Sequence, residues 1–307
     1  MLDVRYAALG ANAPHGFAVH RGALFNLLYE AARGAGVEIA PDHEVLEASA
    51  GALTCKQGAR GGFDLVIDAI GMRSPLSGKP SAPLAFGALW ASLDWAGDFD
   101  PHTLEQRYER ARKMAGVLPI GRLSEDEPVQ AAFFWSLKGE DYAAWRVAPI
   151  EAWKEDVARL WPETDCYLAQ IASHDDLVFA RYAHRTLASP LSRHVVHVGD
   201  SWHCASPQLG QGANMALLDA FALAAALERH ADIADALDAY ARMRLWHIRL
   251  YQSASFLFTP AYQSDSAVIA WVRDWLVSPL AKIWPAPQVL AALVAGAWGA
   301  PLAAIRR

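Results

Sequence analysis

Apolar and polar residues alternate along the first part of this chain in patterns that predict one helix and several strands. Apolar residues spaced three and four apart predict an amphipathic helix over 21–33, and the glycines at 34 and 36 are typical of its end. Short apolar runs predict strands, at 37–39, 44–48, 53–55 and 65–69. The last run is nearly continuous, which is typical of a buried parallel strand. The glycine-rich residues 58–62 are interpreted as a hairpin turn between two strands.

The middle of the chain has a different pattern. Residues 86–95 and 129–137 are rich in aromatic and β-branched side chains, and we expect antiparallel strands there. Between them, residues 103–114 carry many charges and predict a helix with a solvated face. Residues 142–160 predict another helix, closed by Trp161 and Pro162. The change of pattern predicts a second structural unit.

A strand that leads into a glycine-rich helix start follows this unit. The apolar residues 195–198 run into Gly199 and Asp200, and Gly210 to Gly212 open a long apolar helix from about Ala213. An ionised carboxylate accepts hydrogen bonds from ligand hydroxyls, and a helix N-terminus favours an anion or a polarised carbonyl oxygen. The pattern predicts a cradle for a flat ligand. It also describes an ordinary connection between a strand and a helix, so these residues by themselves leave both interpretations open.

The same segment closely resembles the second flavin-binding motif of the group A flavoprotein monooxygenases, the aromatic-hydroxylase-like family. The matching residues are Gly199, Asp200, His203, Pro207, Gly210, Gln211, Gly212, Asn214 and Asp219. The resemblance implies that FAD is the cofactor and that Asp200 binds a ribityl hydroxyl. It implies that the backbone from Gly212 through Ala213 to Asn214 faces the pyrimidine edge of the isoalloxazine ring, and that Pro207 lines the flavin's face. The candidate cofactor-binding residues of this segment are therefore Gly199, Asp200, Pro207, Gly210, Gln211, Gly212, Ala213 and Asn214.

Two upstream stretches extend the resemblance. Residues 16–21 and the leucines that follow resemble the family's strand–arginine–helix segment, in which the arginine, here Arg21, approaches FAD. Residues 64–74 resemble a motif that usually ends in an Ala-Asp-Gly sequence and a serine. Ile70 replaces the aspartate of that motif, and Asp68 stands where a glycine is expected. This departure weakens the expectation of the family's usual nicotinamide interaction here.

One part of the family's pattern has no counterpart in this sequence. Family members begin with a strand–GxGxxG–helix unit that holds the ADP half of FAD. Gly34 and Gly36 end a helix rather than opening one, and residues 58–62 lie between strands. We therefore expect the chain to start partway into the fold. A truncated or misassigned start, a unit supplied by another chain, and loss of FAD binding are all open explanations.

The resemblance implies a mixed α/β (α+β) fold. We expect the remainder of a Rossmann-like FAD-binding domain over 1–80, an inserted antiparallel-sheet substrate domain over 81–190, the second flavin motif over 191–230, and a helical C-terminal region over 231–307. Candidates for an aromatic substrate pocket are Trp90, Phe133, Phe134 and Trp135. Because side chains alternate along a strand, at most two of them face a ligand.

The function implied by the resemblance is an FAD-dependent monooxygenase, whole or truncated. Such enzymes use NAD(P)H and molecular oxygen to hydroxylate an aromatic or other apolar small molecule, and few side chains act directly, so we name no catalytic residue. Two alternatives stay open. The chain could be a non-catalytic remnant of the fold that binds a ligand or partner, or a flavin-dependent reductase of isoprenoid double bonds.

Composition narrows the class of protein. A net charge of −6 without a basic tract argues against nucleic-acid binding. The three cysteines are far apart and odd in number, and no secretory leader pattern opens the chain, so we expect a cytoplasmic protein. His194 and His197 point to opposite faces of a strand, so with His203 they predict no metal site.

Two C-terminal segments have simple interpretations. Arg242, Arg244, His247 and Arg249 lie on a predicted helix, where a solvated or salt-bridged face is expected. Residues 289–305 are uncharged but interrupted by Gly299 and Pro301, which favours a packed terminal helix over a transmembrane segment.

Overall fold

One helix and a small antiparallel sheet form the first part of the chain. The computed structural model describes residues 4–11, 13, 16–192 and 194–306. Helix α1 (Arg21–Gly34) confirms the prediction for 21–33, and the His20 side chain caps it by accepting a hydrogen bond from the Gly22 N–H. The sheet has the order β1-β2-β3, with β1 at Val45–Ser49, β2 at Ala52–Cys55 and β3 at Gly58–Gly61.

Two predictions for this part are wrong. Residues 37–39 form no strand, and the supposed turn at 58–62 contains strand β3, with the turn itself at Lys56 and Gln57. β3 pairs with β2 along its whole length, from Cys55 opposite Gly58 to Ala52 opposite Gly61. Sheet hydrogen bonds are made by the backbone, so a glycine-rich segment can form a strand when a hairpin brings it to a partner.

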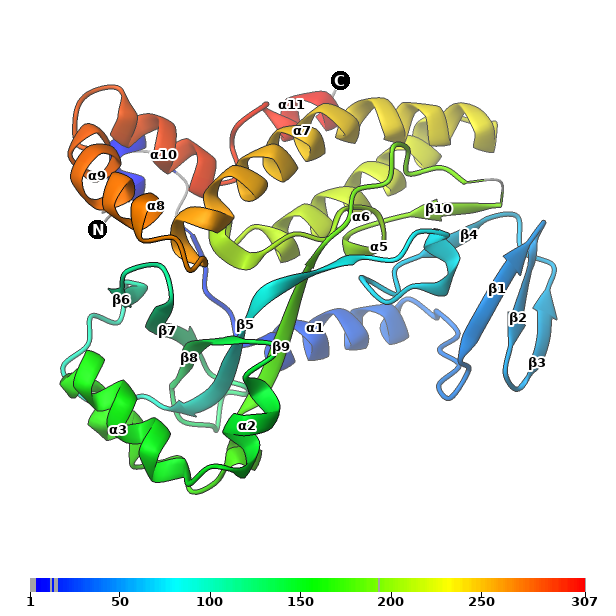
Figure 1. The fold of residues 1–307 in the computed structure, drawn as a ribbon. Helices are drawn as coiled ribbons and strands as arrows, with labels where there is room; N and C mark the ends of the chain where they lie inside the picture. The colour runs from blue at the N-terminus through cyan, green and yellow to red at the C-terminus, as the bar shows by residue number, and fades with distance from the viewer. Residues whose placement is uncertain (1–3, 12, 14–15, 193, 307) are drawn as a thin grey trace.

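A two-stranded parallel sheet is the centre of the second flavin motif. β4 (Val66–Asp68) and β10 (Val195–His197) pair in parallel, with Val66 opposite Val195. Both predicted strands are thus confirmed. Helices α6 (Gly212–Arg229) and α7 (Ile233–Tyr262) pack with them around a buried core. Members of that core are Val196, Trp202, Leu223, Tyr240 and Ile248. In Figure 1, α1 lies on the other side of β4 and β10 from α6 and α7.

A twisted five-stranded antiparallel sheet occupies the middle of the chain, in the order β6-β7-β8-β5-β9. Its strands are β5 (Ala82–Asp94), β6 (Glu105–Glu109), β7 (Lys113–Gly121), β8 (Gln130–Lys138) and β9 (Val178–His184). The predicted strands 86–95 and 129–137 are confirmed as β5 and β8. The predicted helix over 103–114 is wrong, because these residues form most of the β6–β7 hairpin. Arg110 takes the positive φ angle of 58° that the turn requires.

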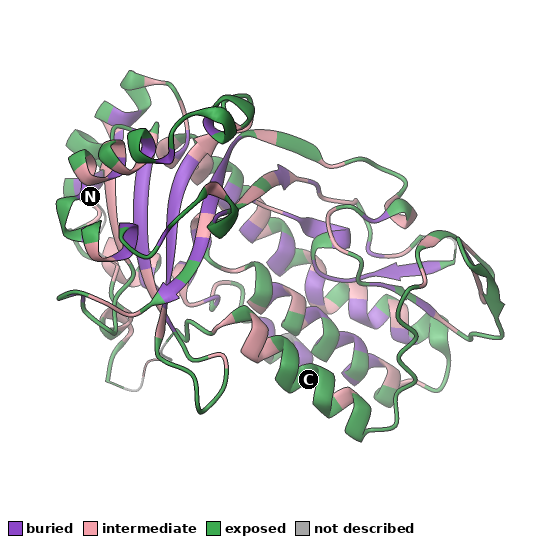
Figure 2. Ribbon diagram, turned by 90° about the horizontal axis from the view of Figure 1, so that it is seen from below, coloured by how far each residue is buried: buried purple, intermediate pink, exposed green. Residues whose placement is uncertain are grey.

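Two short helices cover one face of this sheet. The expected single helix over 142–160 is divided into α2 (Tyr142–Val147) and α3 (Ile150–Leu160), because Pro149 interrupts it. Phe133 and Trp135 of β8 point to this covered face and join Trp153 and Val157 of α3 in a buried core. Figure 2 shows that buried residues run along these strands, whereas β1–β3 are largely exposed.

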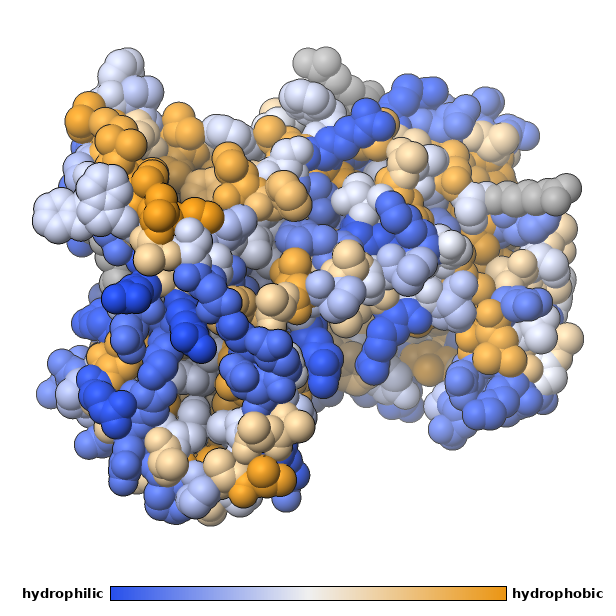
Figure 3. Space-filling model, viewed as in Figure 1, coloured by the Kyte–Doolittle hydropathy of each residue, from blue (hydrophilic) through white to orange (hydrophobic). Residues whose placement is uncertain are grey.

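Helices make up the rest of the chain. After α7 come α8 (Ala267–Val272), α9 (Ser278–Leu280), α10 (Ala286–Val294) and α11 (Pro301–Arg306). Residues 289–305 therefore contain the end of α10 and most of α11, interrupted as expected near Gly299 and Pro301. Figure 3 shows apolar side chains gathered over α8 to α10, where Trp271, Trp275 and Trp284 are exposed. None of the helices among the described residues is both long and apolar enough to span a membrane.

Candidate functional site

The turn from Gly199 to Asp200 connects β10 to the short helix α5 (Asp200–His203). Gly199 has a φ angle of 58°, and a Cβ atom there would lie 3.0 Å from the Cβ of Ala216. Its N–H donates a 2.8 Å hydrogen bond to the buried Asp219 carboxylate. Only glycine fits this turn without strain, because it allows the loop to pack directly on α6. The role of Gly199 in the structure is therefore to place Asp200.

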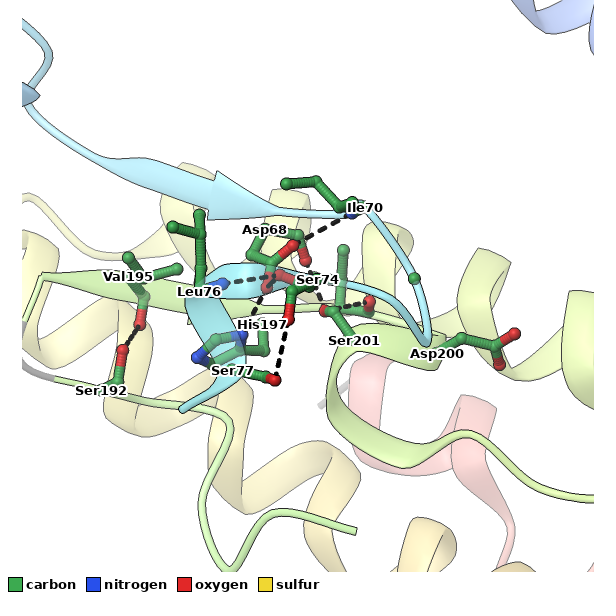
Figure 4. Close-up of polar contacts among 12 residues, drawn as sticks. Asp68, Ile70, Ser74, Leu76, Ser77, Ser192, Val195, His197, Asp200 and Ser201 are labelled. Atoms are coloured by element: carbon green, nitrogen blue, oxygen red, sulfur yellow. Dashed lines mark hydrogen bonds and ion pairs between the residues drawn. The ribbon is translucent and has the colours of Figure 1, made fainter. Parts of the chain in front are cut away.

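The Asp200 carboxylate is free to bind a ligand. The residue is exposed, and its carboxylate has no hydrogen-bond partner in the part of the chain that the structure describes. In Figure 4 its side chain points away from the polar cluster around Asp68. Although the residue reaches solvent, the surrounding protein partly desolvates its carboxyl group and raises the pKa of Asp200, while the charges of His203, Arg21 and Arg185 act against that rise. The predicted residue Arg21, at the start of α1, thus lies close enough to influence this carboxylate.

The N-terminus of α6 offers hydrogen-bond donors beside open space. No side chain caps the helix, and among the described residues the N–H groups of Gly212, Ala213 and Asn214 have no acceptor. A Cβ atom built on Gly210 or Gly212 would meet nothing within 4 Å. Such an uncapped start carries partial positive charge and suits a polarised carbonyl or an anion. The chain therefore leaves room and donors at the position that the sequence predicted.

The side chains of Gln211 and Asn214 make contacts within the protein. Asn214 Nδ2 donates to Gln211 Oε1 at 2.7 Å, and Gln211 Nε2 donates to the Val294 carbonyl at 2.6 Å. A Cβ atom on Gly296 would come within 2.5 Å of both side chains, so α10 and the loop after it pack closely on the motif. Any contact of these two residues with a cofactor would therefore use their backbone. Pro207 is exposed at the start of a 3₁₀ turn, Pro207–Leu209.

A buried ionic network connects the flavin motif to α7, and no pattern in the sequence predicted these contacts. Asp219 accepts hydrogen bonds from His203 Nε2 at 2.6 Å and from Arg244 Nε at 2.7 Å. Arg244 Nη1 donates to His247 Nδ1 at 3.0 Å, which leaves His247 Nε2–H to donate to the Gly296 carbonyl at 3.3 Å. All four side chains are buried. Of the two alternatives expected for this face, solvated or salt-bridged, the ion pair of Arg244 with Asp219 confirms the salt-bridged one at Arg244. Arg244 and His247 are buried because these two positions of α7 face the flavin motif.

The network shifts the pKa values of Asp219 and His247. Burial by itself would raise the pKa of Asp219, but the hydrogen bond and charge of His203 and the charge of Arg244 outweigh it and lower that pKa. Burial and the charge of Arg244 lower the pKa of His247 to about 4, so this histidine is neutral at neutral pH. A neutral His247 is also what its two hydrogen bonds require, since Nδ1 must accept from Arg244.

Asp68 is the centre of a second polar cluster, drawn in Figure 4. It accepts hydrogen bonds from Ser74 Oγ at 2.6 Å, His197 Nδ1 at 2.8 Å and the Ile70 N–H at 3.0 Å. Burial would raise the pKa of Asp68, but these bonds, that of His197 first, lower it. Asp68 therefore holds the loop after β4 in place and has little capacity left for a ligand. Ile70 instead lines an open cavity of about 450 Å³ with Arg73 and the start of β1.

Arg185 links this loop to the Asp200 turn, and no sequence signal pointed to it. It follows β9 directly and is 4% exposed. Nη2 donates to the carbonyl oxygens of Gly71 and Asp200, both at 3.1 Å. Nη1 donates to Ser77 Oγ at 2.7 Å and to the Lys79 carbonyl at 3.0 Å. One guanidinium thus joins the residue after β9 to the loop of residues 71–79 and to the Asp200 turn.

The face of the five-stranded sheet opposite α2 and α3 carries aromatic side chains. Trp90 and Phe134 lie opposite each other in the β5–β8 register, and their rings stack with centroids 4.5 Å apart. Trp90 Nε1 donates to the Tyr182 hydroxyl of β9 at 3.1 Å. Of the four predicted pocket residues, Phe133 and Trp135 point to the helix-covered core, as strand alternation requires. The two others, with Tyr182, form an aromatic wall on the opposite face.

Comparisons with solved structures identify the class of fold. PqsL from Pseudomonas aeruginosa, a probable FAD-dependent monooxygenase, superposes with a TM-score of 0.66 at 20% identity, over 82% of this chain and 72% of PqsL. The 2-methyl-3-hydroxypyridine-5-carboxylic acid oxygenase gives 0.69 at 21% identity, over 91% of this chain and 71% of that chain. HpxO from Klebsiella pneumoniae, in complex with FAD and uric acid, gives 0.61 at 17% identity, over 83% of this chain and 66% of that one. The chain has the fold of the FAD-dependent monooxygenases.

A family model gives the same answer from the sequence. The model for an FAD binding domain matches residues 99–252, half of the chain, including the five-stranded sheet from β6 onward and the second flavin motif. The chain therefore belongs to the FAD binding domain family. No curated protein matches it.

The residues of the site fit the flavin half of FAD. A free carboxylate at Asp200 suits ribityl hydroxyls, and the free N–H groups at the start of α6 suit the carbonyl oxygens of an isoalloxazine ring. In the part of the chain that the structure describes, no group of three or more His, Cys, Asp or Glu side chains is arranged to hold a metal ion.

Proposed function

We propose that this chain is an FAD-dependent monooxygenase that uses NAD(P)H and molecular oxygen to hydroxylate a small aromatic or apolar molecule. The observation that carries the proposal is the free Asp200 carboxylate beside the uncapped start of α6. When bound and reduced by NAD(P)H, FAD activates oxygen for transfer of one oxygen atom to a substrate. The proposed division of the chain has boundaries near residues 80, 190 and 230.

The protein's own groups bind and orient in this proposal. Asp200 accepts hydrogen bonds from the ribityl chain, and the charge of Arg21 supports its ionised form. The partial positive charge at the start of α6, near Gly212 and Ala213, stabilises negative charge on the pyrimidine edge of the ring. Pro207 lines the face of the ring. Gly199, Gly210, Gln211 and Asn214 shape the cradle through their backbone.

The aromatic wall is proposed to hold the substrate. The half-buried Trp90, stacked on the buried Phe134 ring, presents an aromatic surface to the substrate and keeps water away from it. Burial raises the pKa of Tyr182 to about 12, so its hydroxyl keeps its proton at neutral pH. Because that oxygen accepts from Trp90, its O–H can donate to a polar group of the substrate.

A non-catalytic role is the second candidate, and Ile70 favours it. This residue stands where the family's motif has an aspartate, and it lines a cavity with an apolar side chain, while only its backbone N–H binds Asp68. A protein of this kind would bind an aromatic ligand on the wall of Trp90 and Phe134 without oxidising NAD(P)H. A flavin-dependent reductase is the third candidate, and analysis of products for oxygen incorporation separates it from a monooxygenase. All three cysteines are unpaired, which suits the proposed cytoplasmic location.

The test is flavin binding by the purified chain. After addition of FAD and removal of excess, we expect retained visible absorption near ~370 and ~450 nm, which belongs to the flavin group. Asp200→Ala should weaken FAD binding by about 10-fold or more, since a hydrogen bond to a charged group is lost. Asp238→Ala, at an exposed position of α7, is the matched control and should bind FAD like the wild type. Unchanged affinity in Asp200→Ala would show that the site is assigned to the wrong residues.

A further inference from the structure

Arg185 is a buried cation without an ion-pair partner among the described residues. Its four hydrogen-bond acceptors are the carbonyls of Gly71, Lys79 and Asp200 and the hydroxyl of Ser77, all of them uncharged. Its Nε is buried and has no acceptor in the described part of the chain. Burying a guanidinium without a carboxylate is unfavourable, so such an arrangement needs a compensating advantage. In a structural ion pair a contacting carboxylate would provide that compensation, and no carboxylate of the described residues contacts Arg185.

The geometry joins Arg185 to the cradle from three sides. One Nη2 atom binds the Gly71 carbonyl of the loop after β4 and the Asp200 carbonyl of the turn after β10. These two loops are already close, since a Cβ atom on Gly71 would lie 3.9 Å from the Cβ of Asp200. Arg185 also stands three residues after Tyr182 on the same strand end. It therefore connects the aromatic wall to the turn that carries the free carboxylate.

We propose that Arg185 is a positioning residue of the flavin site, which holds the Gly71 loop against the Asp200 turn and keeps a positive charge beside the Asp200 carboxylate. The inference rests on the proposed function. Arg185 does not touch the cofactor in this role. It acts through Asp200, whose carboxylate stays ionised and directed at the ribityl chain, and it fixes the distance between that carboxylate and the substrate wall.

Other groups also face Asp200 and must be counted. His203 of α5 and Arg21 of α1 carry or can carry positive charge next to it, and the Cys204 thiol lies close enough for the Asp200 charge to raise its pKa. Of the two arginines, Arg185 is buried whereas Arg21 is exposed, so solvent screens the charge of Arg21 more strongly. Removing Arg185 should therefore raise the pKa of Asp200 even when Arg21 and His203 are present.

The first experiment is a double-mutant cycle on FAD affinity. We expect Arg185→Met to weaken FAD binding by about 10-fold or more, and to have little further effect in an Asp200→Asn background, because the two residues act together. Arg185→Lys keeps the charge but cannot bridge the two loops with a planar fork, and it should recover part of the loss. Arg181→Met, at an exposed position of β9, is the control and should bind FAD like the wild type. Equal losses in both backgrounds would overturn the proposal.

The second experiment needs no flavin. The carboxyl carbon of Asp200 is identified in ¹³C spectra of the aspartate-labelled protein by its absence in Asp200→Asn, and is titrated without FAD. Arg185→Met should raise the pKa of Asp200, since a positive charge is lost, and Arg185→Lys should return it toward the wild-type value. A merely structural Arg185 would leave this titration unmoved, which would overturn the proposal. If the wild type binds no FAD but the titration shifts, the proposed function fails while the coupling of the two residues stands.

Discussion

The five-stranded sheet and the two-stranded parallel sheet differ in how completely the surrounding elements cover them. The five-stranded sheet has a core of large side chains, among them Leu89, Phe133 and Trp135, under α2 and α3. The parallel pair β4 and β10 is covered by α6 and α7 on one side, but α1 on the other side has no buried residue. Phe25 and Leu27 of α1 are 63% and 69% exposed.

The uncovered region extends beyond α1. Ile67 of β4 and Phe221 of α6 are also exposed, although parallel strands are normally covered on both faces. The difference shows that an apolar pattern predicts a helix or strand, but does not predict that another element covers its apolar face. α1 and β4 form where the sequence places them, while much of their apolar surface meets solvent. Stability should therefore be unevenly distributed over the molecule.

The largest expected effect is the difference in unfolding free energy between two alanine variants, one in the core of the five-stranded sheet and one on α1. Phe133→Ala should lower the free energy of unfolding by about 3–5 kcal/mol, because it opens a cavity between the rings of Trp153 and Tyr167. Phe25→Ala on α1 should cause no measurable loss, since it removes exposed surface. Urea unfolding of both variants measures the difference. Similar losses would show that α1 is buried in solution.

The next effect compares two arginines of the cofactor region. Arg244→Met should lower the free energy of unfolding by about 3 kcal/mol, because it leaves the fully buried Asp219 carboxylate without its arginine partner. Arg33→Met on α1 breaks only an exposed pair with Glu30 and should cause no measurable loss. Thermal unfolding followed by circular dichroism makes the comparison. An unchanged midpoint in Arg244→Met would contradict the importance of the network for the motif.

The smallest expected effect is a pH dependence of the unfolding free energy that arises from His247, on the side of the parallel sheet covered by α6 and α7. The folded-state pKa of His247, about 4, lies below its ordinary value of 6.5, so the unfolded chain binds more protons between these values. Stability from this group is complete above pH 6.5 and is lost as pH falls toward 4, at roughly 1 kcal/mol per pH unit. His247→Gln preserves both hydrogen bonds but cannot be protonated. Its unfolding free energy should fall less than that of the wild type between pH 6.5 and 4.5, and parallel curves would contradict the assignment.

The local pattern was sufficient for much of the fold and of the cradle. α1, α6, β4, β10 and the position of the Asp200 turn follow from periodicity and from the motif, because each depends on residues close in sequence. The many charges of residues 103–114 predict a solvated helix in place of the β6–β7 hairpin only if their spacing is ignored. Glu105, Arg107 and Glu109 alternate with a period of two, which favours a strand.

The parts that the sequence did not predict depend on distant partners. Arg185 binds residues 15 to 114 positions away. A single arginine after a strand belongs to no sequence pattern from which such contacts could be predicted. Arg244 and Asp219 are 25 residues apart on different helices. A basic residue on an amphipathic helix is more often solvated, and only the packing of α7 on α6 turns this one inward.

Helix α7 contacts both the parallel sheet and the five-stranded sheet, so its length fixes the distance between them. Near its start the Tyr240 hydroxyl donates to the His197 carbonyl of β10, and at its end the Tyr262 ring packs on Tyr108 of β6. A helix rises about 1.5 Å and turns about 100° per residue, so these two tyrosines are roughly 33 Å apart along the axis. One residue gained or lost between them would turn Tyr262 away from β6. A homologous chain that keeps both contacts must therefore have the same number of residues between these two tyrosines. Insertions and deletions in such a chain are expected in the loops.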